Sequence, residues 1–199
     1  MLGEGEHDLS PGDDVTVRGD IGWVRDLLEA PAGSAGTVGG LLSDHFAYFY
    51  RISDPSITAK LSDLTAEAVV SAASRLGIPE GGVYAALWEG SSAFDLMAGT
   101  PLPFPSGAIG ELGLPGRFPY RVYLAESQRD LTDLLVGFES HGQRSCPDIW
   151  WSSAGDWVAV SSHDLDGTYA ASASEVSTRD ASVATFALVD ASERLKPSS

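Results

Sequence analysis

The sequence predicts a single α+β domain, with a mixed or antiparallel sheet of about five or six strands and about three helices mainly on one face. Three observations favour this class. Strand-like apolar segments are interspersed with amphipathic helical segments. The 199 residues are enough to bury a sizeable core. Hydrophobic residues make up 43% of the chain and charged residues 20%, as in globular proteins. We expect residues 1–18 to form a mobile acidic arm, residues 19–192 to form the domain, and residues 193–199 to fray.

Three segments carry the apolar period and the end signals of helices. The first covers residues 21–30, and the second runs from its N-cap Thr65 to Leu76, with mostly small apolar side chains that suggest close packing on a sheet. The third opens at Ser127. Its apolar face comprises Leu131, Leu134, Leu135 and Phe138.

Five segments indicate strands. Residues 41–52 and 120–124 alternate with a period of two, and flanking glycines favour a strand at 83–89. Residues 157–163 are predicted to form a strand, and residues 183–189, which follow a polar turn at 177–180, form a last apolar run.

The segment between the second and third of these strands, residues 90–118, is rich in Gly, Pro and Ser. A stretch of this length without strong element signals is either an ordered lid over a site or a flexible loop. The sequence leaves both readings open.

The charge of the chain bears on its partners. It has 28 acidic against 12 basic residues, a formal charge of −16, and the basic residues are scattered. A field of this sign repels phosphate backbones and anionic lipid, so we expect neither nucleic-acid nor membrane binding. A basic protein partner would be attracted. The alternative, that the acidity reflects solubility and composition, stays open, and the sequence does not predict the oligomeric state.

Cysteine and histidine usage argues against the common metal sites. Cys146 is the only cysteine, so neither an intramolecular disulfide nor a zinc site of paired cysteines can form. The four histidines lack a short metal-ligand spacing. We expect no metal and no cofactor. The acidic start and the lack of a long apolar run favour a cytoplasmic protein.

The segment from Cys146 to Tyr169 gathers three tryptophans and several carboxylates. Within it, Asp164-Leu165-Asp166-Gly167-Thr168 resembles the first motif of haloacid dehalogenase-type phosphatases, in which the first aspartate is a nucleophile and the second an acid/base. That motif normally ends the first strand of a long domain, and the residues after Thr168 are too few for one. A calcium loop is also disfavoured, because Tyr169 stands where the loop requires glycine.

Two arrangements of polar side chains in this segment stay open. If the strand from Trp157 continues, Asp164 and Asp166 project on one face and could hold a cation or act as an acid/base pair, although a solvated acidic edge is the simpler interpretation. A hydrolase triad of Ser161, His163 and Asp164 is the other.

The tryptophan segment also carries a resemblance to a family. Pro147-Asp148-Ile149-Trp150-Trp151 is followed by Trp157 and then by Asp164, Thr168 and Tyr169. This spacing resembles a family of uncharacterised actinobacterial proteins with a Pro-Asn-Leu-Trp-Trp segment and a strand that starts at a tryptophan. Gly155 stands where the family has an arginine, and Ser162 where it has a glutamate. The resemblance implies a shared α+β fold and no assigned activity.

Two hypotheses for function follow. The first is a cytoplasmic, acidic protein-binding module of the immunity-protein kind, without catalytic residues. Its contact residues would be aromatic, because aromatic side chains are enriched at interfaces. Its binding residues would be the aromatic side chains Trp150, Trp151, Trp88 and Tyr48.

The second hypothesis is a small-molecule-binding protein or enzyme in which residues 90–118 close over a pocket. Its ligand or acid/base groups would be the carboxylates Glu89, Asp164 and Asp166. The direction in which Trp150 and Trp151 point bears directly on the first hypothesis, since buried rings would make them core residues.

Overall fold

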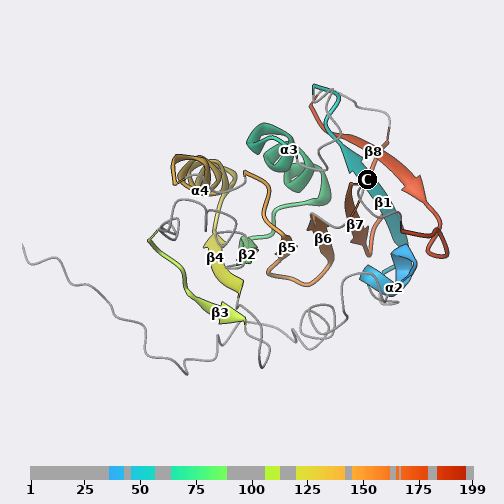
Figure 1. Ribbon diagram of the computed structural model, residues 1–199, viewed down its shortest axis with the longest axis horizontal. Coiled ribbons are helices and arrows are strands. Elements are labelled where there is room, and N and C mark those ends of the chain that lie inside the picture. The colour runs from blue at the N-terminus through green and yellow to red at the C-terminus, as the bar shows by residue number, and fades with distance from the viewer. Residues whose placement is uncertain are drawn as a thin grey trace, which may run out of the picture.

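A computed structural model of the chain describes residues 36–42, 46–56, 64–88, 106–112, 120–141, 145–161, 165, 167–178 and 183–195. In this part of the chain, eight strands form one sheet in which every neighbouring pair is antiparallel (Figure 1). The strand order is β3-β4-β2-β5-β6-β7-β1-β8. The strands are β1 (Tyr48–Ser53), β2 (Val83–Trp88), β3 (Gly110–Leu112), β4 (Tyr120–Ala125), β5 (Ile149–Ser152), β6 (Trp157–Ser161), β7 (Thr168–Ser172) and β8 (Thr185–Val189).

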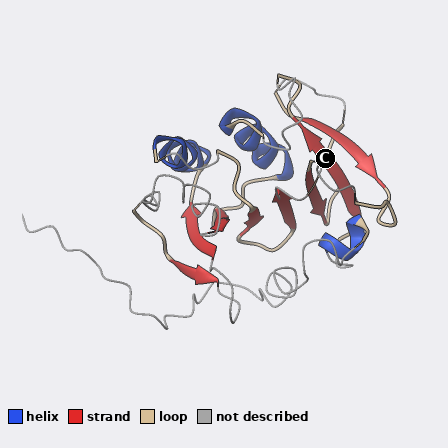
Figure 2. Ribbon diagram, in the orientation of Figure 1, coloured by secondary structure: helices blue, strands red, loops and turns tan. Residues whose placement is uncertain are grey.

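Helices pack on both faces of the sheet (Figure 2). They are α2 (Val38–Leu42), α3 (Ala66–Leu76) and α4 (Gln128–Ser140). The α3 and α4 helices share one face, and α2 lies on the other. The predicted α+β class with its antiparallel sheet is therefore confirmed.

The predicted number of strands is wrong, because the sheet has eight strands rather than five or six. The three additional strands are β3, β5 and β7. The β3 strand has only three residues and lies in the segment rich in Gly and Pro. Every residue of β5 and β7 is buried, so neither strand has the polar–apolar alternation that reveals a half-buried strand.

The strand predicted at residues 41–52 is also corrected. Residues 38–42 form α2, in which the Gly40 amide donates to Thr37 Oγ1 at 3.2 Å, and the strand begins only at Tyr48. The α2 helix is tied to the end of the described chain. The Val38 amide donates to Glu193 O at 2.9 Å, and Thr37 forms an isolated antiparallel β-bridge with Arg194. Residues 193–195, which the sequence places in a frayed tail, thus bond to the start of α2.

Both long helices begin where their end signals predict. The side chain of Thr65 accepts from the Ala68 amide at 3.2 Å, and that of Ser127 accepts from the Asp130 amide at 3.2 Å. At the other end of α3, Gly77 adopts a φ of 102° and its amide donates to Ala73 O. This conformation favours glycine. The helix predicted at residues 21–30 and the arm predicted at residues 1–18 lie outside the described residues.

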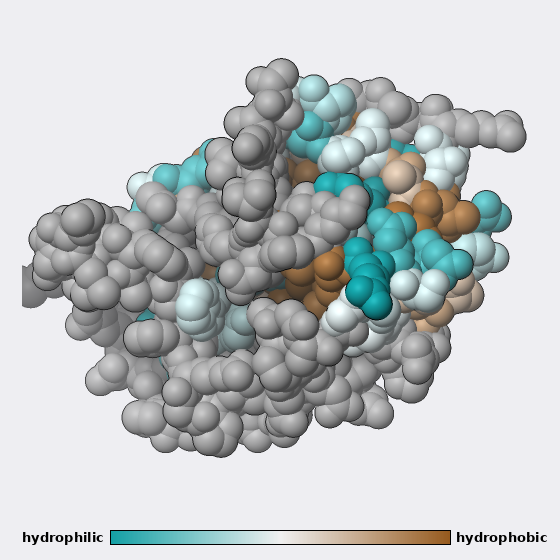
Figure 3. Space-filling model, turned by 45° about the vertical axis from the view of Figure 1, so that its right-hand side comes forward, coloured by the Kyte–Doolittle hydropathy of each residue, from teal (hydrophilic) through white to brown (hydrophobic). Residues whose placement is uncertain are grey.

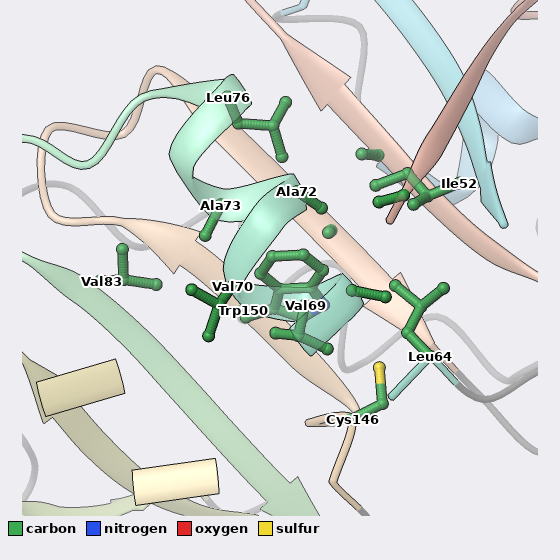
Figure 4. Close-up of a cluster of buried hydrophobic side chains, with 14 of the residues drawn as sticks. Ile52, Leu64, Val69, Val70, Ala72, Ala73, Leu76, Val83, Cys146 and Trp150 are labelled. Atoms are coloured by element: carbon green, nitrogen blue, oxygen red, sulfur yellow. The ribbon is translucent and has the colours of Figure 1, made fainter. Parts of the chain in front are cut away.

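The core consists of two clusters, one on each face of the sheet. The face that we call the α3 face carries side chains of α3 and α4 packed on alternate residues of the strands. The opposite face, the α2 face, carries side chains of α2 packed on the intervening residues. Small residues of α3 meet the sheet, as the sequence suggests, so that the helix lies close to it (Figure 4). These buried α3 residues are Ala68, Val69, Val70, Ala72, Ala73 and Leu76.

A tight turn leads from α3 into β2. Gly82 has a φ of 83°, and a Cβ at this position would lie 2.3 Å from Ala125 O. Its carbonyl accepts from the Ser153 amide at 3.0 Å. Only glycine fits at this position, where the turn lies close to Ala125 of β4 and to Ser153, which follows β5. These contacts align β2 between β4 and β5.

Candidate functional site

The tryptophan pair of β5 points to both faces of the sheet. The Trp150 side chain is 0% exposed on the α3 face, where it lies beneath α3 (Figure 4) and packs edge-to-face against Trp157 with ring centroids 5.6 Å apart. The Trp151 side chain is 1% exposed on the α2 face and stacks on Tyr84 at 5.3 Å. Two adjacent strand residues alternate in this way because successive side chains point to opposite faces.

The burial of both rings corrects the prediction that Trp150 and Trp151 are binding residues. A ring with no exposed surface cannot contact a partner without unfolding the layer above it. Small side chains beside Trp150 in the sheet, Ala85 on β2 and Ala159 on β6, leave room for the indole. The two rings are therefore core residues, one packed between the sheet and each of its two covering layers.

Trp88 and Tyr48 are half-buried but do not form one surface. Trp88 is the last residue of β2, and its amide donates to Asp148 Oδ2 at 2.7 Å. Tyr48 is the first residue of β1 and packs against the α3-face cluster. Three strands, β5, β6 and β7, separate β2 from β1 in the sheet. These two rings therefore do not form one contiguous aromatic patch.

The carboxylates of the small-molecule hypothesis lie outside the described residues. This applies to Glu89, Asp164 and Asp166, and to residues 90–118 except 106–112, which include β3. Among the described residues, no group of three or more His, Cys, Asp and Glu side chains is arranged to hold a metal ion. No helix of the described part is long and apolar enough to cross a membrane.

Among the described residues, the buried polar and charged side chains other than tyrosine and tryptophan lie on one face. The described residues include six that are buried and polar or charged, and each is two positions from a residue of the α3-face cluster along its chain segment. Alternation therefore places all six on the α3 side. They are Asp54, Asp148, Ser152, Ser161, Thr168 and Ser172.

Ser161 and Thr168 form a hydroxyl pair at one end of β6 and β7. Thr168 Oγ1 donates to Ser161 Oγ at 3.0 Å, and the Ser161 amide donates to Asp148 O at 2.8 Å. Both side chains are 0% exposed. A serine in this position is closed to a substrate, which argues against Ser161 as the nucleophile of a triad with His163 and Asp164. Those two partners lie outside the described residues.

Asp54 is a buried carboxylate that accepts four hydrogen bonds. It follows β1, and its Oδ1 accepts from the Ser56 amide at 2.8 Å and from Ser56 Oγ at 2.5 Å. Its Oδ2 accepts from Thr65 Oγ1 at 2.6 Å and from the Thr65 amide at 3.4 Å. Burial alone raises the pKa of Asp54, but these four bonds outweigh burial, so the pKa lies below its usual value. The ionised carboxylate thus joins the end of β1 to the N-terminus of α3.

Three further contacts tie the layers of the α3 face together. Trp157 Nε1 donates to Gly77 O at 2.6 Å, which holds the end of α3 on β6. Tyr50 accepts from the Val176 amide at 2.8 Å through its hydroxyl. The guanidinium of Arg75 donates to two backbone carbonyls and lies 4.4 Å from the centre of the Phe186 ring. The side chains that make these contacts are thus engaged in holding the layers together.

The exposed apolar side chains mark the surfaces that are open to a partner. The large ones among the described residues are Ile109, Val136 and Leu188, which is the most exposed at 62%. The run at residues 183–189 predicted the strand that holds Leu188. It did not predict which residues are exposed, because the run has no alternation. The one signal that could have indicated a sheet edge is that this apolar run is the last of the predicted strands.

Comparison of the chain with protein-family models, with curated proteins and with solved structures finds no match in any of the three.

Proposed function

We propose that the protein is a cytoplasmic, acidic protein-binding module of the immunity-protein kind, which acts without catalysis on a basic partner protein. The observation that carries the proposal is the formal charge of −16 from 28 acidic and 12 basic residues. A charge of this size attracts a basic partner over several ångströms and accelerates its association. It equally repels nucleic acid and anionic lipid.

The layout of the described residues supports this function rather than a reaction. Its buried hydroxyls and carboxylates bond to one another or to the backbone, as Asp54, Ser161 and Thr168 show. Its exposed groups include acidic side chains and single apolar ones such as Leu188. A surface of this composition suits steered association with a cationic protein.

A capture experiment with the full chain tests the proposal. The immobilised protein is exposed to extract of its native host, and the retained proteins are identified by mass spectrometry and then purified. We expect a partner with a net positive charge whose affinity falls steeply as salt rises from about 50 to about 300 mM, since salt screens the attraction. An acidic or neutral partner, or an affinity that does not depend on salt, would contradict the proposal.

A further inference from the structure

The two edges of the sheet differ in how they are protected. Edge strands expose backbone amides and carbonyls that can pair with another chain, and proteins limit this with short strands and charged side chains. The β3 edge has both features, because it is three residues long and its exposed Glu111 lies opposite Arg121 of β4. The β8 edge has five residues, Thr-Phe-Ala-Leu-Val, with neither a charge nor a proline.

The outer side of β8 is open among the described residues. In that part of the chain β8 pairs only with β1. Ala187 and Leu188 are exposed near the C-terminal end of the strand. Figure 3 turns this flank of the molecule toward the viewer and shows apolar residues reaching the surface beside strongly polar ones.

The strand is held rigidly from its inner side. Phe186 packs edge-to-face on Tyr50 at 5.6 Å and lies beneath the guanidinium of Arg75. Thr185 and Ser53 exchange a hydroxyl hydrogen bond of 2.7 Å across the β1–β8 pair. A strand fixed in its extended form before binding loses little conformational entropy when another strand pairs with it.

Two exposed carboxylates near this edge are suited to a cation, and the basic residue beside them in the sheet is Arg51 of β1, opposite Ala187. Asp190 follows β8 directly, is exposed, and has its carboxylate oriented by the Ser192 amide and hydroxyl at 2.8 and 2.7 Å. Glu175 is exposed and precedes Val176, whose amide donates to the hydroxyl of Tyr50, the residue opposite Leu188. The nearby Arg75 is committed to the carbonyls of Ala184 and Ser177.

We propose that the β8 edge is where the partner binds, by adding an extended segment of its own as a ninth strand, with an apolar side chain over Leu188 and a lysine or arginine at Asp190. This inference rests on the proposed function, since it gives the basic partner a site. A second copy of the chain is the less suitable occupant, because two chains of charge −16 repel each other.

Two peptide probes and two matched variants test the inference by amide chemical shifts of the full chain. The basic probe is the blocked peptide Lys-Thr-Val-Thr-Val-Thr-Lys, and the acidic probe replaces both lysines with glutamate. Leu188→Lys places a charge on the edge. Val136→Lys makes the same change in charge at another exposed apolar residue, 53% exposed on α4, and is the control.

We expect the basic probe to shift the amides of Ala187, Leu188 and Asp190, and the acidic probe to bind far more weakly. Leu188→Lys should weaken binding about tenfold or more, because a lysine on an edge strand opposes pairing. Val136→Lys should leave it nearly unchanged. Asp190→Asn should weaken the basic probe severalfold and leave the acidic probe unaffected.

Three results would overturn the inference in different ways. If the basic probe shifts amides elsewhere and both lysine variants bind it equally, β8 is not the site, and the proposal of a basic partner stands. If both probes shift β8 equally, the edge pairs without regard to charge, and the basic partner is refuted. If β8 amides shift only with protein concentration, a second copy occupies the edge.

Discussion

The two faces of the sheet each carry an apolar core cluster but differ in polarity. The α3 face contains all six buried polar side chains of the described residues, and the α2-face cluster is built of apolar and aromatic side chains alone. On the α3 face, bonds from Asp54, Tyr50 and Trp157 join different layers. On the α2 face, the described ring contact is the stack of Tyr84 on Trp151.

This difference shows how each layer is positioned. Apolar contacts are non-directional, so they stabilise a layer without fixing its orientation. Directional hydrogen bonds fix both ends of α3. Thr65 at the N-terminal end bonds to Asp54, which follows β1, and Gly77 at the C-terminal end accepts from Trp157 of β6. We infer that side-chain hydrogen bonds orient α3 on its face, whereas α2 is held by apolar packing and by backbone bonds to Ala191 and Glu193.

The largest expected effect compares the two tryptophans of β5. Trp150→Ala and Trp151→Ala should each lower the free energy of unfolding by about 3–5 kcal/mol, because each removes a fully buried ring and leaves a cavity. Urea denaturation followed by far-ultraviolet circular dichroism measures both. A loss below about 1 kcal/mol for Trp151→Ala alone would show that the α2 face is not a core layer.

The next effect concerns the buried carboxylate of the α3 face. Asp54→Asn should cost about 2 kcal/mol at pH 7, because the amide oxygen accepts more weakly than a carboxylate and the amide nitrogen cannot accept from Ser56 or Thr65. Asp190→Asn is the matched control. Asp190 also accepts from a serine two residues further on, but it is exposed, so its replacement should change stability little.

The pH dependence of the unfolding free energy tests the same carboxylate, and the pKa of Asp54 sets its direction. The pKa of Asp54 lies below its usual value in the folded protein, so its contribution is present above the unfolded pKa of about 4 and is lost as the pH falls through the folded pKa. The difference in unfolding free energy between wild type and Asp54→Asn should therefore shrink below about pH 4. A difference that stays constant down to pH 2 would contradict the assignment.

A smaller effect separates the two indoles of the α3 face. Trp157 Nε1 donates to Gly77 O, whereas Trp150 Nε1 is buried and has no partner among the described residues. Trp157→Phe breaks a bond and leaves a carbonyl without its donor, and Trp150→Phe removes an unpaired donor. We expect Trp157→Phe to cost about 1–2 kcal/mol more than Trp150→Phe. Equal costs in chemical denaturation would mean that the Gly77 bond contributes nothing.

The smallest effect compares tyrosines on opposite faces. Tyr50→Phe removes the acceptor of the buried Val176 amide and should cost about 1 kcal/mol. Tyr84→Phe keeps the ring stacked on Trp151 and should stay within about 0.5 kcal/mol of wild type. Thermal unfolding of both variants measures the difference, and a larger loss for Tyr84→Phe would reverse the proposed contrast between the faces.

The candidate site shows how far local signals reach. The sequence placed Trp150 and Trp151 in one apolar segment and suggested them as an interface, because adjacent tryptophans carry no mark of burial. The tertiary structure decided otherwise, since β5 lies between β2 and β6 and a core cluster covers each face of the sheet there. The exposed position of Leu188 was equally hidden, because an uninterrupted apolar run reads the same at a sheet centre and at an edge.

The sequence by itself determined the α+β class, the two long helices with their N-caps at Thr65 and Ser127, and the strands β2, β4, β6 and β8 within a few residues. These signals are local: a cap bonds three residues away, and a helix period shows within a few turns. Only the tertiary structure decided that β5 and β7 are strands, that the polar groups share one face, and that β8 is an open edge. Those features depend on which distant segments become neighbours, and that is set by packing of the whole core rather than by any one stretch of residues.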